Sequence, residues 1–331
     1  MQDCRKMRRG PLQVELLLFA ACATGFLNAQ TTPQKLLWHD PGDVSKADLG
    51  GSVGTGIGAP QPPFTFIKED MSGTQPKVQV KDGAGRIWVA KFGNEVKPEC
   101  FTWRIPVAAG YYVEPSYYIA SAQFLNAGAM QRKTPSIQRD GHFKDARFQI
   151  RDPNFKYLDD RSWKWAGNPF AGSKELKGLE ILIMLASNWD NKDGTALPGD
   201  SNTGIFERVV NGRHELIYSF TDWGSGMGLW GDKGGQSDWA CADYSRQTSD
   251  FVKGVVNGQV VFGYDGHHND DFKTNIHPAD VAWLMKYLGQ LRDEQLRAAL
   301  QASGATSSEV TCFTKAIRTR IEQLKKVSGS P

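Results

Sequence analysis

Apolar and polar residues alternate along three short runs that begin near Phe64. The runs are "FTFIKED", "KVQVKD" and "RIWVAKF", separated by "MSGTQP" and by "DGAG". Runs rich in β-branched and aromatic residues that are bounded by Gly, Pro and Asp are typical of strands, and "DGAG" is a strong hairpin turn. The pattern therefore predicts three consecutive antiparallel strands.

Helical spacing follows in "EVKPECFTWRIPVAAG", where Pro98 and Pro106 limit or kink the helix. Residues 111–120 predict a further strand, whereas 127–172 is polar and irregular, with one clear strand. Ser173 can cap a helix through "KELKGLEILIMLAS" that is buried on most sides. After a loop, we expect a strand at "HELIYSF" and helices around "PADVAWLMKYLGQL", "DEQLRAALQA" and "SEVTCFTKAIRTRIEQLKK".

These elements predict an α+β protein with a two-lobed arrangement, a β-rich N-terminal lobe and a mainly helical C-terminal lobe. No internal repeat is present. A cleft between two lobes would bring together the polar motifs near their junction, and a ligand is expected there. The predicted parts are a signal peptide at 1–30, a Gly- and Pro-rich lead-in on the surface at 31–63, the N-terminal lobe at 64–126, a linker with insertions at 127–172 and the C-terminal lobe at 173–331.

The first thirty residues have the order of a secretory signal. Four basic residues precede "LLLFAACATGFL", and the small or polar residues "NAQ" follow. We therefore expect export to the periplasm or to the outside of the cell. "LFAAC", which ends at Cys22, resembles a lipoprotein box that would anchor the chain through a lipid, and an uncleaved membrane anchor is a second alternative. No later segment approaches the roughly 20 apolar residues of a spanning helix.

Composition narrows the classes of function. The chain has 331 residues, of which 40% are hydrophobic and 23% charged, which is ordinary for a soluble globular protein. A formal net charge of +3, evenly spread, argues against a nucleic-acid binder. Without the signal, Cys100, Cys241 and Cys312 remain, and their spacing predicts neither a disulfide framework nor a zinc site. One disulfide at most can form, and buried small hydrophobes with one free thiol are the favoured interpretation.

The loop "MSGTQPK" joins two of the predicted strands, with Ser72, Gly73 and Thr74 at its tip. A short Gly-containing loop can turn backbone N–H groups toward phosphate oxygens. A plain β-turn is the alternative, because Gly beside Ser and Thr is common turn chemistry.

Lys91 lies inside the apolar run "WVAKFG", where a Lys is costly unless its ammonium reaches an anion or water. Glu95 and Glu99 follow at or near the predicted helix. A strand Lys held by a helical Glu is how protein kinases fix the α- and β-phosphates of ATP. An edge-strand Lys with its head in water is the alternative.

Two carboxylates stand at the ends of buried runs farther along the chain. In "LIMLASNWDNKDGT", Asp190 can accept or orient a proton, and Lys192 can neutralise a transferring phosphoryl group. In "SFTDWGSGMG", Asp222 follows a predicted strand and precedes Gly224, which allows close approach. Such a carboxylate is suited to hold Mg²⁺ against phosphate oxygens.

The order of these motifs, "SGTQPK", the strand Lys, the helical Glu, "NWDNKD" and "TDWG", resembles the atypical branch of the protein-kinase-like fold, and HipA-like kinases most closely. The D-x-K loop is also similar to that of phosphoinositide and lipid kinases. The resemblance covers about residues 64–300 through five short motifs. It implies ATP and Mg²⁺ as cofactors, and transfer of the γ-phosphoryl group to an unknown hydroxyl on a protein, lipid or sugar.

The resemblance also implies a role for each motif. The residues carried over are Ser72, Gly73 and Thr74 as the phosphate loop, Lys91 with Glu99 or Glu95 as its partner, Asp190 and Lys192 as catalytic residues, and Asp222 as the metal ligand. Thr195 stands where such kinases carry an Asn for a second metal. Three alternatives follow: Asn191 or Asn202 takes the place of this Asn, or only one metal binds, or activity is lost. If activity is lost, the alternative function is an exported kinase-like binding module (a pseudokinase), which scarce ATP outside the cytoplasm also favours.

Other patterns in the sequence give weaker indications of function. "DGHHNDD" could form a metal cluster from Asp265, His267, His268, Asp270 and Asp271, but it lacks the i, i+4 spacing of a helical zinc site, and a solvated loop is favoured. The ten Trp residues could line a sugar-binding surface, although several lie in predicted strands or helices and are more often core. No GxSxG or HExxH pattern supports a hydrolase.

Overall fold

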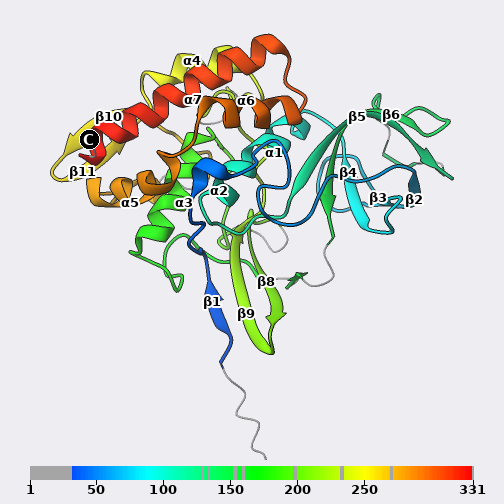
Figure 1. The fold of residues 1–331 in the computed structure, drawn as a ribbon, viewed down its shortest axis with the longest axis horizontal. Coiled ribbons are helices and arrows are strands. Elements are labelled where there is room, and N and C mark those ends of the chain that lie inside the picture. Colours follow the sequence, from blue (N-terminus) through cyan, green and yellow to red (C-terminus); the bar gives the residue numbers. More distant parts are fainter. Residues whose placement is uncertain are drawn as a thin grey trace, which may run out of the picture. The chain divides into compact units, whose positions relative to one another are not determined.

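A computed structural model describes residues 32–128, 130–132, 134–151, 155–158, 161–196, 200–231, 235–268 and 271–329 (Figure 1). The predicted signal peptide and the lipid box at Cys22 therefore lie outside the described residues. Within the described residues, no helix is both long enough and apolar enough to cross a membrane.

Five strands close into a barrel in the order β2-β3-β4-β6-β5. Their bounds are β2 (Phe64–Glu69), β3 (Lys77–Lys81), β4 (Ile87–Lys91), β5 (Ser116–Leu125) and β6 (His142–Ile150). The three predicted strands are confirmed, and "DGAG" forms the β3–β4 hairpin. Parallel pairing of Phe64 with Phe124 closes the barrel, whose interior is filled by aromatic and aliphatic side chains.

Two sequence-based boundaries around the barrel are wrong. The strand expected at 111–120 lies five residues later, at β5, and β6 belongs to the barrel although it falls within the predicted linker 127–172. The β-rich part therefore runs to Ile150 instead of ending at 126. The error has a physical cause, because β6 pairs with both β4 and β5 and gains its stability from these distant partners.

The predicted helix after β4 is split in two. Helix α1 (Val96–Thr102) ends before Trp103, and α2 (Arg104–Ala108) follows directly. Pro98 lies in the first turn of α1, where a missing N–H removes no helical hydrogen bond. Pro106 has no N–H to donate to Thr102 O, so the hydrogen-bond ladder is interrupted between α1 and α2. The expectation that proline limits this helix is therefore confirmed at Pro106.

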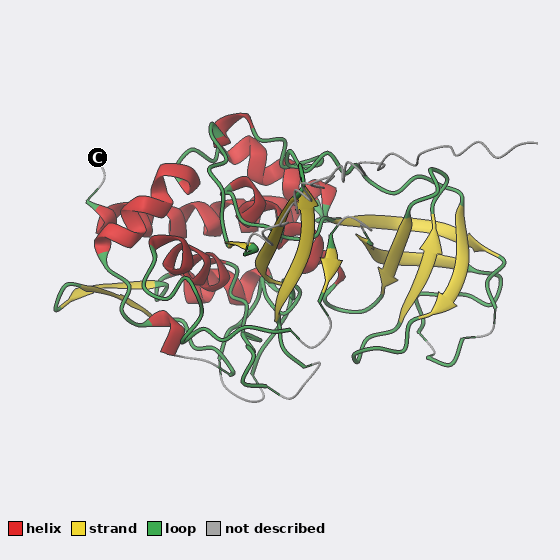
Figure 2. Ribbon diagram, turned by 90° about the horizontal axis from the view of Figure 1, so that it is seen from below, coloured by secondary structure: helices red, strands yellow, loops and turns green. Residues whose placement is uncertain are grey.

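Most of the remaining chain is helical, and Figure 2 shows these helices grouped apart from the barrel strands. Ser173 caps α3 (Lys174–Leu185) by accepting a hydrogen bond from Leu176 N, as predicted. The three predicted C-terminal helices are confirmed as α5 (Pro278–Leu288), α6 (Asp293–Ala302) and α7 (Ser307–Ser328). Helix α4 (Cys241–Thr248) and the hairpin of β10 (Val252–Val256) with β11 (Gln259–Phe262) had no counterpart in the expectation.

A second sheet has the order β1-β9-β8-β7. Its strands are β1 (Gln34–Leu36), β7 (Lys156–Tyr157), β8 (Thr203–Val210) and β9 (Arg213–Phe220). Only β9 was predicted. The region from 173 onward is thus less purely helical than expected.

The segment 31–63 is not simply a surface lead-in. Strand β1 pairs with β9, and four apolar side chains of the segment, Leu37, Val44, Leu49 and Val53, are buried. Its backbone is held by side chains from elsewhere: Arg104 donates to Leu49 O at 2.7 Å and to Gly51 O at 2.8 Å. A short 3₁₀ turn, Val44–Lys46, lies in the same segment. The few apolar residues of this segment are enough to pack it against the rest of the protein, because their side chains reach the core.

The end of α3 is fixed by a buried guanidinium. Arg320 of α7 donates to Leu185 O at 3.1 Å, to Ser187 Oγ at 2.7 Å and to Tyr244 O at 2.9 Å. It thereby satisfies carbonyl groups that the end of a helix leaves without partners. The motif "NWDNKD" begins at Asn188, directly after Ser187. The hydrogen bonds of Arg320 therefore fix the position at which this motif starts.

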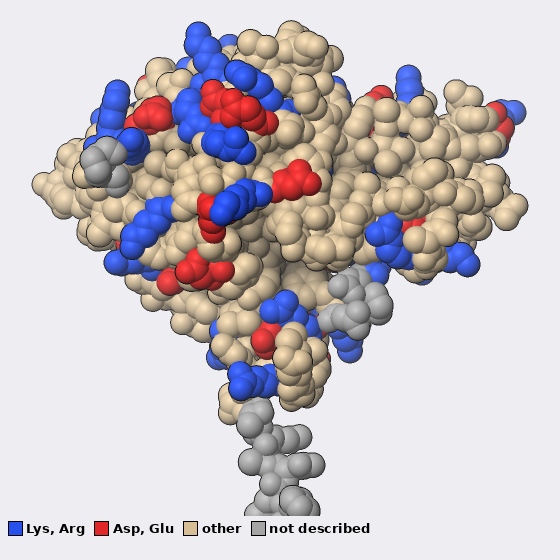
Figure 3. Space-filling view, in the orientation of Figure 1, with Lys and Arg blue, Asp and Glu red and all other residues tan. Residues whose placement is uncertain are grey.

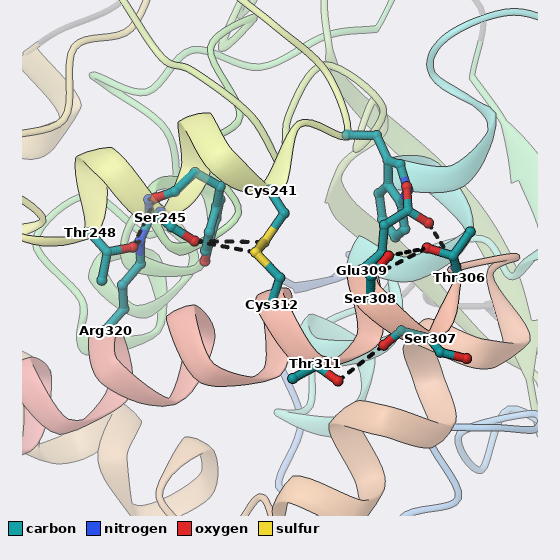
Figure 4. The surroundings of a disulfide bond; sticks show 12 residues. Cys241, Ser245, Thr248, Thr306, Ser307, Ser308, Glu309, Thr311, Cys312 and Arg320 are labelled. Carbon is teal, nitrogen blue, oxygen red and sulfur yellow. Dashed lines mark hydrogen bonds between the residues drawn. A yellow bond between two sulfur atoms is a disulfide. The ribbon is translucent and has the colours of Figure 1, made fainter.

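Helices α4 and α7 are also joined by a disulfide between Cys241 and Cys312 (Figure 4). This is the one disulfide that the cysteine count allowed, and Cys100 is the free thiol, which is buried. Disulfides persist in oxidising compartments.

We predict that replacing both disulfide cysteines, Cys241→Ser with Cys312→Ser, lowers the free energy of unfolding by about 2–4 kcal/mol. The crosslink spans a sequence separation of 71 residues and so restricts the unfolded chain. Urea unfolding of both proteins, with and without reductant, measures this loss in the free energy of unfolding. Wild type should lose the same stability when reduced, whereas the double variant should not respond; equal stability of wild type and variant would contradict the prediction.

Glu180 on α3 is buried, with Lys177 Nζ 2.8 Å from its Oε2. Burial raises the pKa of Glu180 to about 7, although Lys177 opposes the rise. The folded chain therefore binds this proton more tightly than the unfolded chain does.

We predict that this carboxyl lowers stability as the pH rises from about 4.5 to 7. Below that window the acid is protonated in both states and costs nothing. Above it, ionisation costs the folded state about 3 kcal/mol by linkage. The free energy of unfolding of Glu180→Gln should therefore match that of wild type near pH 4 and exceed it at pH 8. If the free energies of unfolding of the two proteins change with pH in parallel, Glu180 does not have the raised pKa assigned to it.

Candidate functional site

Lys91 is buried at the end of β4 between two carboxylates of the following chain. Its Nζ forms an ion pair with Glu95 Oε2, and Glu99 Oε1 lies 3.4 Å away. Both predicted partners therefore contact the Lys. Burial lowers the pKa of Lys91, but the attraction of Glu99, Asp222 and Glu95 outweighs it, and the net pKa is raised. Lys91 stays charged, and the alternative of an edge-strand Lys in water is wrong.

A second buried cation, Arg147 on β6, holds the same carboxylate. Its Nε donates to Glu99 Oε2 at 2.7 Å and its NH2 to Oε1 at 3.3 Å, a two-point contact of the stronger kind. Sequence reasoning missed Arg147. The available signal was the one used for Lys91, a charged residue inside an apolar strand, here "DARFQI".

The "TDWG" motif is packed directly onto α1. A Cβ on Gly224 would lie 2.8 Å from Glu95 Cβ and 2.9 Å from Glu99 Cγ, so this position requires glycine. Thr102 Oγ1 of α1 donates to Trp223 O at 2.7 Å. Asp222 is brought close enough to Lys91 for its charge to act on the ammonium.

The "NWDNKD" motif leaves α3 and lies against the same loop. Asn188 Nδ2 donates to Asp222 O at 2.9 Å, and Trp189 N donates to Ser225 O at 3.0 Å. Lys192 Nζ lies 3.2 Å from Asp190 Oδ2. The structure thus gathers the predicted residues of both motifs beside Lys91.

The carboxylates repel one another. Burial raises the pKa of Asp190, and the charge of Asp222 adds to the rise, while Lys192 and His268 oppose it. Burial also raises the pKa of Glu95, with Asp222 and Glu99 contributing repulsion against the attraction of Lys91. Converging like charges of this kind favour a cation.

Asp238 is a further carboxylate at this site that sequence reasoning missed. Trp189 Nε1 donates to its Oδ1 at 3.0 Å. Burial raises the pKa of Asp238 to about 6, and repulsion by Asp222 and Asp190 adds to it, whereas Trp189 and Lys91 oppose it. No sequence motif surrounds Asp238 that could have identified it.

The amide expected five residues after Asp190 is supplied from elsewhere. Thr195 Oγ1 donates to Asp193 Oδ1 at 2.6 Å within a local turn. Asn202, by contrast, is buried, and its Nδ2 donates to Asp190 O at 2.6 Å. Asn191 is held by another loop, since its Oδ1 accepts from His268 N at 3.2 Å. Of the candidates for the missing amide, Asn202 is therefore the one fixed to the backbone of Asp190.

The loop at Ser72, Gly73 and Thr74 lies at the same end of the barrel as Lys91, because Phe92 N donates to Pro76 O at 3.0 Å. Ser72 N and Oγ both donate to Asp70 Oδ1, at 3.0 and 2.6 Å, which is ordinary turn chemistry. Gly73 has a left-handed backbone with φ of 59°.

A cavity of about 1090 Å³ lies beside the barrel, and Lys91, Glu95, Glu99, Asp190 and Asp222 are not among its lining residues. Side chains alternate along a strand, so Ile87 lies on the same face of β4 as Lys91, and Gln149 lies on the same face of β6 as Arg147. Both line the cavity, as does Thr221, next to Asp222. An aromatic wall completes it, in which Phe155 stacks on Phe206 at 4.4 Å between ring centroids.

The described residues contain no group of three His, Cys, Asp or Glu side chains arranged for a metal, and so give no support to the alternative of a metal cluster in "DGHHNDD". Asp270 and the side chain of Asp271 lie outside the described part. The favoured solvated loop agrees with the half-buried residues 265–267 and the exposed His268, although His268 Nε2 also lies 3.2 Å from Asp190 Oδ1.

Positive and negative side chains are interspersed on the face drawn in Figure 3, in keeping with the small net charge.

Comparison with known proteins found no matching family model, no matching curated protein and no matching solved structure. The geometry of the site is therefore what supports a function.

Proposed function

We propose that the chain is an exported, ATP-dependent phosphotransferase of kinase-like design, which transfers the γ-phosphoryl group to a hydroxyl acceptor. The observation that carries the proposal is the buried Lys91 held by Glu95 and Glu99 with Asp190 and Asp222 close by. A strand Lys paired with a helical Glu, an acceptor-side Asp and a metal-binding Asp are the recurring parts of protein-kinase sites.

The cavity suits the base and ribose of ATP. It is large enough for a nucleotide, and its wall combines Phe155 and Phe206 with the polar side chain of Gln149. Ligand sites are mostly apolar clefts with a few placed polar groups. A nucleotide lying there would extend its phosphates along the barrel face toward Lys91.

The residues present fit Mg²⁺. This ion takes one or two carboxylates together with substrate phosphates, so a cage of three protein ligands is not required. Asp222 supplies a carboxylate and Asn202 an amide oxygen beside Asp190, and the repulsion among these carboxylates is relieved by a cation. When bound, the ion would neutralise charge on the phosphates.

Each side chain then has a task. Lys91 binds phosphate oxygens and is kept in place by Glu95 and Glu99. Asp190 accepts the hydrogen bond of the acceptor hydroxyl, and its raised pKa brings it closer to that of a base suited to neutral pH. Lys192 places a positive charge beside the transferred group, as electrostatic stabilisation of the transition state requires.

The alternative function is a kinase-like binding module without catalysis. Its main support in the sequence was Thr195 in place of an Asn. Because Asn202 occupies the position on the Asp190 backbone, that argument loses its force. Scarce ATP outside the cytoplasm still favours the module, and the disulfide supports export for either function.

We predict that Lys91→Ala weakens binding of Mg-ATP by about tenfold or more, because a charge-assisted contact to phosphate contributes about 1.5–3 kcal/mol. Titration calorimetry on the full chain measures it. Lys81→Ala, on the exposed end of β3, is the matched control and should bind as wild type does. Absence of Mg-ATP binding by wild type, or equal binding by Lys91→Ala, would exclude the nucleotide site.

We predict different effects for the two carboxylates. Asp222→Asn should weaken Mg²⁺-dependent binding of ATP, since the metal loses its protein carboxylate. Asp190→Asn should leave binding nearly unchanged and lower turnover by about 10² to 10⁴. ADP release measures turnover with water or any hydroxyl compound as acceptor, and Asp250→Asn, at an exposed position, is the control. A wild type that binds Mg-ATP but releases no ADP would favour the binding module.

A further inference from the structure

The segment that follows β11 is bound along the whole of the "NWDN" stretch. Tyr264 Oη donates to Asn188 O, His267 N donates to Trp189 O at 2.8 Å, and His268 N donates to Asn191 Oδ1 at 3.2 Å. Three successive anchor points align 264–268 with 188–191. This contact is much more specific than the solvated loop that the sequence favours.

Close approach of the two segments depends on Gly266. A Cβ at this position would lie 2.8 Å from Tyr264 Oη and would also collide with the amide of Asn191. Any side chain there would push the segment away from "NWDN". The glycine therefore sets the position of the two residues that follow it.

The alignment places His268 on the carboxylate of Asp190. His268 Nε2 lies 3.2 Å from Oδ1, while Lys192 Nζ lies 3.2 Å from Oδ2. Asp190 is only 9% exposed, and its buried Oδ1 accepts no aligned hydrogen bond from any residue in the described ranges. One carboxylate oxygen is thus bounded by an imidazole and the other by an ammonium.

We propose that His268 is a positioning residue for the acceptor side of this site, acting through Asp190. This inference rests on the proposed function. In the reaction, the acceptor oxygen bonds to the γ-phosphorus of ATP and the bond from that phosphorus to the β–γ bridging oxygen breaks. ADP leaves, and the hydroxyl proton passes to Asp190.

The ring of His268 restricts the carboxylate of Asp190 by contact on the side of Oδ1, where its Nε2 lies 3.2 Å away. Burial lowers the pKa of His268, as do His267 and Lys192, against the attraction of Asp190 and Asp200. A lowered pKa favours the neutral ring, which limits the positions open to the carboxylate without adding a charge.

Two variants separate this role from a merely structural one. His268→Ala removes the ring, and His268→Gln keeps an amide nitrogen at the position of Nε2 but cannot titrate. We expect His268→Ala to lower the rate of ADP release about 10-fold to 100-fold, with unchanged affinity for Mg-ATP. His268→Gln should recover most of the rate, because its amide nitrogen restores the contact beside Asp190 Oδ1. His214→Ala, an exposed His, is the control.

The pairing is measured independently of activity by NMR titration of the His268 ring in wild type and in Asp190→Asn. Loss of the neighbouring charge should lower the ring's pKa further. An unchanged ring pKa would overturn the pairing. ADP release by wild type with no change in His268→Ala, or with a rate in His268→Gln as low as in His268→Ala, would overturn the positioning role. Absence of ADP release by wild type, with the ring shift present, would instead overturn the phosphotransferase.

Discussion

Glu99 is the residue on which the site depends, because its carboxylate binds two buried cations from neighbouring strands. Lys91 and Arg147 are cross-strand partners on β4 and β6, where two like charges would repel each other. Glu99 compensates both, and α1 is thereby fixed to the outer face of the barrel. Gly224 packs against the side chain of Glu99. The position of Asp222, two residues before Gly224, therefore also depends on Glu99. Removing one partner would leave a buried charge uncompensated, which costs several kcal/mol.

The second half of the site is positioned by a different kind of contact. Arg320 fixes the end of α3 at Leu185 and Ser187. Hydrogen bonds that each involve a backbone group then tie 188–191 to two loops, one carrying Asp222 and the other His268. Ionic contacts dominate on the barrel side, whereas hydrogen bonds to and from the backbone dominate here. The difference suits the assigned tasks, because phosphate binding needs charge while proton transfer needs precise orientation.

Local patterns in the sequence were sufficient for elements stabilised by their own residues. The barrel strands β2 to β4, helix α3 with its Ser173 cap, and the C-terminal helices follow from periodicity and capping. Among the strands that were missed, β1 and β7 are very short, and β1 pairs with the distant β9. Strand β8 is different, because it forms a hairpin with β9 across Asn211 and Gly212, a turn signal that is present in the sequence. The same distinction applies to the site: motif residues were identifiable, whereas Arg147, Asp238 and His268 reach it only through contacts between segments far apart in the chain.

The disulfide has a consequence for where this protein becomes functional. Cys241 lies three residues after Asp238, so the crosslink to α7 also restrains the chain that carries this carboxylate toward Asp190 and Asp222. Backbone hydrogen bonds from Trp239 and Ala240 hold the same stretch, and the crosslink adds a covalent restraint to them. If the proposed phosphotransferase is exported, this restraint on Asp238 would be added only after the chain has left the reducing cytoplasm.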